Sequence, residues 1–203
     1  MLGGERARVG LVLVATTLWA APTLGQDRVD GNVYASARYG IQIAKPAAWH
    51  FITAQTALDL ARKAAGPVGS GRPRGDEDPV RAAGFAVIVS KSPILGRTFD
   101  PQVIVLVNEL ADPPSDLVQV CESVRAGMTE PKTVTPTRET RLGETPAARL
   151  DFQGLVDGTP VRATALCVAR DRRVFVVVGQ ALAADFASVA STFETILSSF
   201  RLN

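Results

Sequence analysis

Apolar and polar residues alternate along much of the chain in the pattern of half-buried β-strands. Ile41 and Ile43 fall on one face and Gln42 on the other, which predicts a strand over residues 40–44. The clearest turns are Asp157-Gly158 and residues 170–173, and the second half of the chain is therefore predicted to form a meander. Segments that alternate, or that are rich in β-branched residues, predict further strands over residues 33–37, 85–90, 103–110, 134–139, 147–152, 161–169 and 174–180.

Two helices are predicted, one early and one late in the chain. Residues 56–65 are rich in Ala and Leu, and the spacing of Thr56 and Asp59 predicts a capping box at their start. Gly66-Pro67 is placed to end this helix. The late helix is amphipathic, with apolar residues at helical spacing: Phe186, Val189, Phe193, Leu197 and Phe200.

A third helix is predicted to begin with Asp112 as its N-cap and Pro113 as its first helical residue. Its apolar positions recur at i, i+4, i+7 and i+11, on one face: Leu117, Cys121, Val124 and Met128. Helices and strands in consecutive runs predict the α+β class. We expect a mostly antiparallel sheet of about six to eight strands, sandwiched by about three helices.

Residues 1–25 have the three regions of a secretory signal peptide. Arg6 and Arg8 provide a positive start, the apolar stretch 9–21 follows, and small residues precede a cleavage site after residue 25. Cleavage after Ala20 is the alternative. We therefore expect an exported protein, located in the periplasm or outside the cell.

The same segment is short for a membrane anchor. Its apolar stretch of about 13 residues falls below the roughly 20 that cross a bilayer as a helix. Gln26 stands where a lipoprotein signal would have its cysteine. The mature chain is thus expected to be soluble, without stable insertion in a membrane after cleavage.

Composition narrows the class of the mature chain, residues 26–203, which we expect to form a single domain. The sequence is 46% hydrophobic and 21% charged, as in ordinary globular proteins, which excludes a disordered tail. The net charge of only +2, without basic residues interleaved with aromatics, argues against nucleic-acid binding. One histidine and two cysteines are too few for a typical four-ligand zinc site. We expect neither a metal nor a cofactor.

The two cysteines are the most informative pair of residues. Cys121 lies on the apolar face of the middle predicted helix, and Cys167 lies on the small-residue face of its predicted strand. A helix packed on that face would bring them together, and in an oxidising compartment a disulfide would follow. The loop-entropy estimate for a bridge of this span is about 4 kcal/mol. Two buried free thiols are the alternative interpretation.

Residues 66–80 are expected to form a flexible loop rich in Gly, Pro and charge. The acidic run could in principle attract calcium, but its spacing matches no calcium-binding loop, and a solvated, mixed-charge loop is the better interpretation. Because loops on rigid scaffolds often carry binding, it is a possible partner-contact loop. The residues concerned are Arg72, Arg74, Asp76, Glu77 and Asp78.

No recognisable catalytic arrangement is present in the sequence. Ser-x-x-Lys and Gly-x-Ser-x-Gly are absent, and the glycines at 66 and 71 are followed by Arg72-Pro73, not by the Lys-Ser/Thr of a phosphate loop. The single histidine, His50, has no nucleophile or orienting carboxylate nearby in sequence. Arg170, Arg172 and Arg173 form a small cluster, for which a solvated hairpin tip is favoured over a phosphate or anionic-lipid contact.

The two ends of the mature chain resemble those of PsbP-like domains. The first motif is Tyr39-Gly40-Ile41-x-Ile43-x-x-Pro46-x-x-Trp49, and the second is a strand, Phe186, and then Phe193-Glu194-x-x-Leu197-x-Ser199-Phe200. This superfamily includes the extrinsic photosystem II subunit and exported bacterial PsbP/DcrB-like domains of unknown function. The resemblance implies an antiparallel sheet sandwiched by helices and, usually, a non-enzymatic role in binding or assembly.

The sequence thus predicts an exported, soluble, non-catalytic binding or accessory module. Its expected partner is an envelope protein or a small apolar ligand. The alternatives are a small hydrolase-like enzyme of unfamiliar design and a purely structural component of the envelope.

Overall fold

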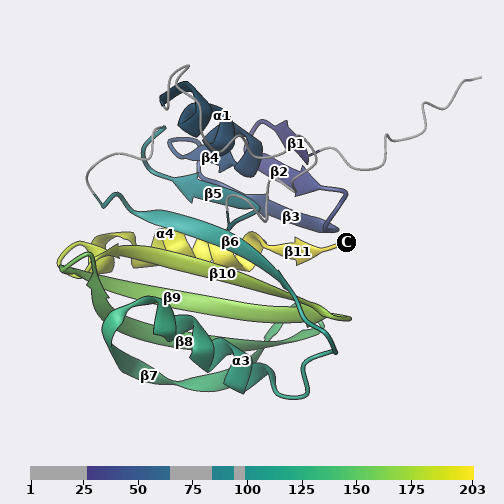
Figure 1. Cartoon of the computed structure of the whole chain (residues 1–203), viewed down its shortest axis with the longest axis vertical. Helices are drawn as coiled ribbons and strands as arrows, with labels where there is room; N and C mark the ends of the chain where they lie inside the picture. Colours follow the sequence, from purple (N-terminus) through teal and green to yellow (C-terminus); the bar gives the residue numbers. More distant parts are fainter. Residues whose placement is uncertain (1–26, 65–83, 94–98) are drawn as a thin grey trace, which may run out of the picture.

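The computed structural model describes residues 27–64, 84–93 and 99–203, and its ribbon is shown in Figure 1. The signal peptide predicted over residues 1–25 and the loop predicted over residues 66–80 lie outside these ranges, so both stay predictions. Within the described residues the strands form two antiparallel sheets, of four and seven strands. The predicted α+β class is therefore confirmed, with the strands divided between two sheets.

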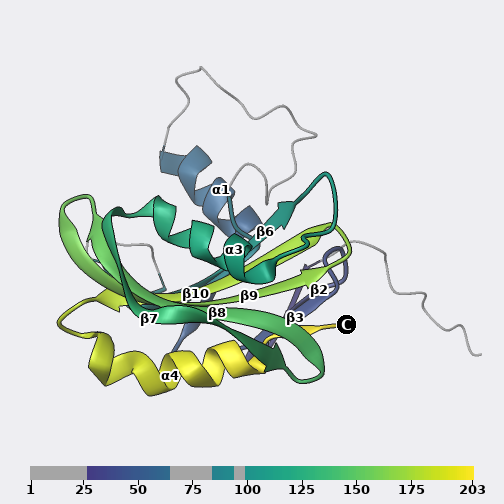
Figure 2. The same cartoon turned by 90° about the horizontal axis from the view of Figure 1, so that it is seen from below.

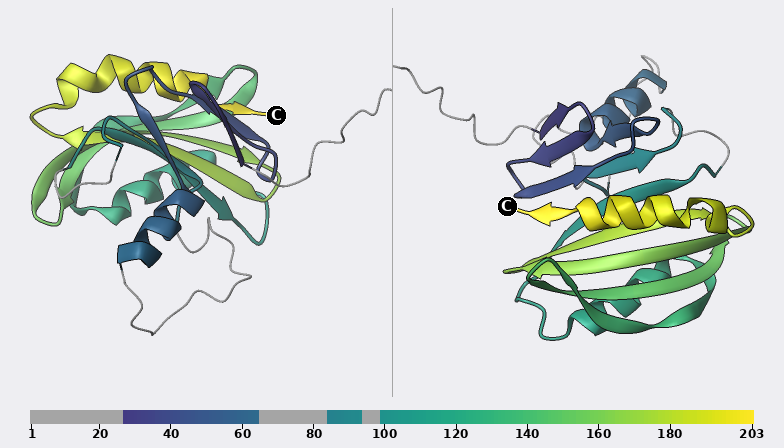
Figure 3. Two further views of the ribbon diagram at one scale, coloured as in Figure 1. Left: turned by 90° about the horizontal axis from the view of Figure 1, so that it is seen from above. Right: turned by 180° about the vertical axis from the view of Figure 1, so that it is seen from behind.

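The smaller sheet has the order β1-β2-β3-β11. Its strands are β1 (Asp27–Asp30), β2 (Val33–Ser36), β3 (Ile41–Ala44) and β11 (Arg201–Leu202). The last of these comes directly after the final helix and pairs Leu202 with Ile41. Figure 3 shows, in its right panel, that this strand brings the C-terminus beside β3.

The larger sheet has the order β4-β5-β6-β10-β9-β8-β7, and every pairing is antiparallel. The strands of this sheet are β4 (His50–Thr53), β5 (Val87–Ser90), β6 (Gln102–Glu109), β7 (Thr129–Leu142), β8 (Thr145–Val156), β9 (Thr159–Arg170) and β10 (Arg173–Leu182). The turn predicted at Asp157-Gly158 joins β8 to β9, and it is of type I′ because both residues have positive φ, 49° and 76°.

Strand β7 is much longer than the predicted 134–139. Pro131 and Pro136 fall inside it, and their missing N–H groups are tolerated because β7 is the outermost strand of the sheet. Its pairing with β8 is interrupted by register shifts around these prolines and becomes regular from Arg138 onward.

The helices occupy opposite faces of the larger sheet (Figure 2). α4 (Phe186–Ser199) covers one face, together with the smaller sheet, while α1 (Ala54–Ala64) and α3 (Leu117–Ser123) lie on the other. A short 3₁₀ turn, η1 (Val124–Gly127), follows α3. Because both faces of β10 are covered, its run from Val174 to Val178 is buried throughout.

Two helix starts differ from the predictions. α1 begins at Ala54, where the Thr53 hydroxyl accepts a hydrogen bond from the Thr56 amide, so Thr53 and not Thr56 caps the helix. α3 begins at Leu117 and not at Pro113. Pro113 precedes a second proline, which disfavours a helical conformation there, and Asp116 caps α3 by accepting from the Gln119 amide at 3.0 Å.

The residues that resemble PsbP-like domains gather in one core between α4 and the two sheets. Trp49 meets Phe193 edge to face at 6.2 Å, and Phe175 packs on Phe200 at 6.1 Å. The core cluster includes members from both sheets and from α4, among them Tyr39, Ile41, Ile43, Val103, Val177 and Leu197. Aromatic residues at both ends of the chain thus close one hydrophobic core.

An ion-pair network reinforces the α4 face. Arg149 on β8 donates two hydrogen bonds to Glu194 on α4, one of 2.7 Å, and a third of 3.0 Å to the Thr164 hydroxyl on β9. Asp151 lies 3.6 Å from the same guanidinium. The hydrogen bond to Glu194 raises the pKa of Arg149 above its usual value, and the pair links helix and sheet as a clamp.

Candidate functional site

A cysteine pair holds α3 against the larger sheet. Cys121 from α3 and Cys167 from β9 lie at disulfide distance, with Cα atoms 5.6 Å apart, and both are fully buried. Cys167 belongs to the small-residue face of β9, beside Ala163 and Ala165. Small side chains on this face allow the helix to approach, as the sequence predicted. Such pairs are typical of an oxidising, non-cytoplasmic compartment.

Polar contacts tie the same part of the helix to β7. The Thr137 hydroxyl donates to the Glu122 carboxylate at 2.5 Å, and Arg125 pairs with Glu122 at 2.8 Å. Arg125 also donates to the Thr133 hydroxyl. The middle and end of α3 are therefore anchored to β7 and β9.

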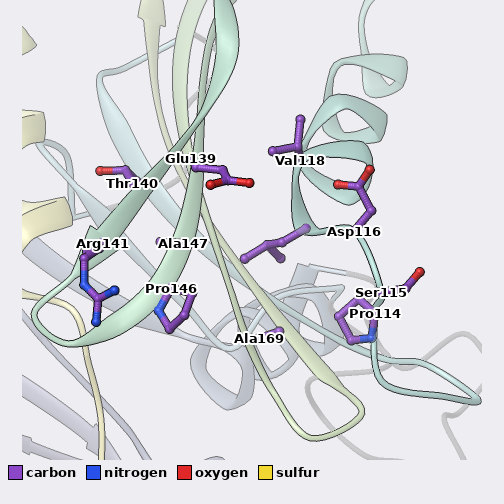
Figure 4. Close-up of a pocket in the computed structure, with 11 residues that line it drawn as sticks. Pro114, Ser115, Asp116, Val118, Glu139, Thr140, Arg141, Pro146, Ala147 and Ala169 are labelled. Carbon is purple, nitrogen blue, oxygen red and sulfur yellow. The ribbon is translucent and has the colours of Figure 1, made fainter.

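The start of α3 is different, because a cleft of about 940 Å³ separates it from the neighbouring strands. Figure 4 shows the helix start on one side of this cleft and the β7–β8 hairpin on the other. We call it the α3 cleft, and its lining comes from three strands and from the helix with its preceding segment: Pro114, Ser115, Asp116, Leu117, Val118, Glu139, Thr140, Arg141, Pro146, Ala147 and Ala169.

The α3 cleft combines small apolar surfaces with an excess of acidic groups. Asp116 and Glu139 supply two carboxylates, and within the described part of the chain the Glu139 side chain has no hydrogen-bond or ion-pair partner. Arg141 is the one arginine in the lining, and it donates to the Glu144 carbonyl in the β7–β8 turn. The cleft is thus suited to a ligand that carries both a positive charge and small apolar groups.

The cleft also reaches a sheet edge. Glu139, Thr140 and Arg141 are consecutive, and neighbouring side chains of a strand point to opposite faces, so all three line one cleft only where it includes the edge of β7. In the described sheet β7 pairs with β8 alone, which leaves its outer backbone groups available. From Arg138 to Leu142 the strand is regular and free of proline.

The structure brings together only some of the residues singled out in the sequence. Cys121 and Cys167 meet, whereas the predicted partner-contact loop with Arg72, Arg74, Asp76, Glu77 and Asp78 lies outside the described residues. His50 is exposed at the start of β4, opposite Ser90, and it lines none of the clefts described here.

The cleft residues Glu139, Arg141 and Pro146 were not predicted from the sequence. The one signal that points to them is the Gly143-Glu144 turn, which predicts a hairpin and places Glu139 and Pro146 on adjacent strands.

The described residues contain neither a candidate metal site nor a helix that could span a membrane. Across residues 27–64, 84–93 and 99–203, no three His, Cys, Asp or Glu side chains are grouped so that they could hold a metal ion. None of the helices in these ranges has the length and apolar character needed to cross a bilayer.

A likeness to a solved structure identifies the fold as PsbP-like. The solution structure of cyanobacterial PsbP (CyanoP) from Synechocystis sp. PCC 6803 matches 86% of this chain and 95% of its own, with a TM-score of 0.53 and 14% identity. LpqN, involved in cell envelope biogenesis of Mycobacterium tuberculosis, matches 79% of this chain and 81% of its own, with a TM-score of 0.48 and 12% identity. No family model and no curated protein sequence matches.

Proposed function

We propose that this protein is an exported, non-catalytic binding module whose α3 cleft holds an extended segment of an envelope protein. The observation that carries the proposal is the meeting of an open, acidic cleft with the regular, unpaired edge of β7. An extended segment can add to such an edge through main-chain hydrogen bonds, while alternate side chains enter the neighbouring cleft.

The residues that line the cleft indicate which side chains the bound segment should carry. Small apolar side chains fit beside Leu117, Ala147 and Ala169, and a Lys or Arg fits near Glu139. The proline-bearing and irregular first half of β7 discourages pairing, whereas residues 138–142 permit it. A segment of about five residues would therefore pair beside the cleft.

A small apolar ligand is less well supported by this lining. Pockets that hold such ligands are predominantly apolar and enclose most of the ligand surface. The α3 cleft has instead two carboxylates and an open side toward solvent.

Site-specific photo-crosslinking in the host envelope tests the proposal. A benzoylphenylalanine replaces Pro146, which is exposed in the cleft, or Ser191, which is exposed on α4 at the opposite face. We expect a crosslinked protein from position 146 and none from position 191. In the 146 background, Glu139→Lys should abolish the crosslink, whereas Asp30→Lys, an exposed charge reversal on β1, should leave it unchanged.

Other results would contradict the proposal. Equal crosslinking from both positions, or a crosslink insensitive to Glu139→Lys, would show that the cleft is not the binding site. A small-molecule adduct in native mass spectra of the purified protein, without a protein crosslink, would instead identify a ligand carrier.

A further inference from the structure

A second hollow, of about 420 Å³, opens on the other face of the larger sheet from the α3 cleft. It lies where the β2–β3 turn meets the β9–β10 turn. Its charged lining consists of four arginines and two carboxylates: Arg38, Arg170, Arg172, Arg173, Glu109 and Asp171. We propose that this arginine pocket binds the phosphate group of a phosphate monoester.

The fold assembles the pocket from parts that are far apart in the sequence. Arg38 and Arg173 are 135 positions apart, yet Arg173 Nη1 lies 3.5 Å from the Arg38 carbonyl oxygen. Gly40 leaves room for another arginine of the pocket, since a Cβ there would lie only 3.1 Å from both Arg170 Nη1 and the main-chain oxygen of Asn203. Its φ of +61° also favours glycine. The packing of the two turns against each other therefore forms the pocket. Arg170, Arg172 and Arg173 are part of it and do more than cover a solvated hairpin tip.

One aromatic ring orients two of the arginines. The guanidinium carbons of Arg38 and Arg173 lie 5.3 Å and 5.9 Å from the centre of the Tyr39 ring, within the range of cation–π attraction. Tyr39 is only 8% exposed and belongs to the core, so its position is fixed. Ordering these long side chains before a ligand arrives reduces the entropy lost on binding.

Charge and donor geometry favour a phosphate monoester. Among the lining side chains, four arginines outnumber two carboxylates, and this excess of positive charge suits the nearly double negative charge of a monoester at neutral pH. Arg170 donates to the Asn203 carbonyl and Arg172 lies 3.9 Å from Glu109, in an ion pair exposed on both sides. Each guanidinium has five N–H donors, so Arg172 and Arg173, with one polar contact each given above, keep donors for the oxygens of a phosphate.

Two sources could supply this group, a soluble phosphate ester or a lipid headgroup, and the experiment separates them. NMR titrations of the full mature protein use glycerol 1-phosphate, and flotation assays use phosphatidylcholine vesicles with or without phosphatidic acid. Arg172→Gln removes an exposed charge from the pocket, and Arg138→Gln removes an exposed charge on β7 as the matched control. Melting temperatures of both variants confirm that they fold.

We expect saturable shifts of the amides of residues 38–40 and 170–173 with glycerol 1-phosphate, weakened about tenfold by Arg172→Gln and unchanged by Arg138→Gln. Flotation only with phosphatidic acid vesicles, with the same dependence on Arg172, assigns the phosphate to a lipid. Flotation equal to that with phosphatidylcholine alone assigns it to a soluble ester. Equal weakening by both variants, or the absence of saturable binding to either probe, would overturn the proposal.

Discussion

The Cys121–Cys167 pair provides the sharpest test of how this fold is stabilised. α3 has only seven residues, and a helix of that length is not stable without tertiary contacts. Reduction of the pair would leave α3 held by its apolar packing on the larger sheet and by the contacts of Glu122 and Arg125 with β7, while Asp116 only caps the start of the helix. Because α3 forms one wall of the α3 cleft, we expect reduction to loosen this wall as well as to destabilise the protein.

The expected loss of stability on reduction follows from the length of the loop that the cysteine pair closes. For a sequence separation of 46 residues, the loss of unfolded-state entropy corresponds to about 4 kcal/mol. Both sulfur atoms remain in an apolar cluster after reduction, so neither a buried charge nor a large cavity adds to this loss of stability. For a domain of this size, 4 kcal/mol corresponds to a fall in melting temperature of roughly 8–16 °C.

The assay compares thermal unfolding of the protein, purified from an oxidising compartment, with and without a phosphine reductant. The wild type should melt at a lower temperature when reduced, whereas a Cys121→Ala/Cys167→Ala variant should not respond to reductant. Hydrogen exchange should accelerate in α3 and remain slow in α4, which buries five side chains of its own. Full alkylation of both cysteines without reductant, or equal melting temperatures, would refute the reasoning.

Two further predictions concern the opposite face of the larger sheet. Gly179→Ala should destabilise the protein by about 1–3 kcal/mol in urea unfolding, because its Cβ would lie 2.9 Å from the Phe193 ring in the closed core. Gly127→Ala, with nothing within 4 Å of its Cβ, should stay within about 0.5 kcal/mol of wild type, and equal effects would contradict this packing argument. Arg149→Met should cost about 1–2 kcal/mol and Glu194→Gln less than about 1 kcal/mol, since the Glu194 side chain is 51% exposed. Unfolding midpoints that rank Glu194→Gln as the more damaging change would contradict the proposed clamp.

Local pattern was sufficient to predict much of the fold. The alternation at Ile41 and Ile43, the positive-φ turn at Asp157-Gly158 and the apolar stripe of α4 are properties of neighbouring residues, and the structure confirms all three. The predicted β7 was too short because a nonlocal condition decided its extent. Pro136 lies within a strand because β7 is at the edge of the sheet. The residues around Pro136 do not indicate that position in the sheet.

The sequence by itself determined the α+β class, the buried faces and the meeting of Cys121 with Cys167. The reason is that the spacing of apolar residues along each helix or strand indicates which of its sides is buried. Tertiary structure alone decided the division of the strands into two sheets, the α3 cleft and the arginine pocket. Arg38 and Arg173 come together only because the chain ends fold back and aromatic residues from both ends pack into one core. Such contacts depend on the summed burial of many side chains over the whole chain, and this sum is not encoded in any single motif.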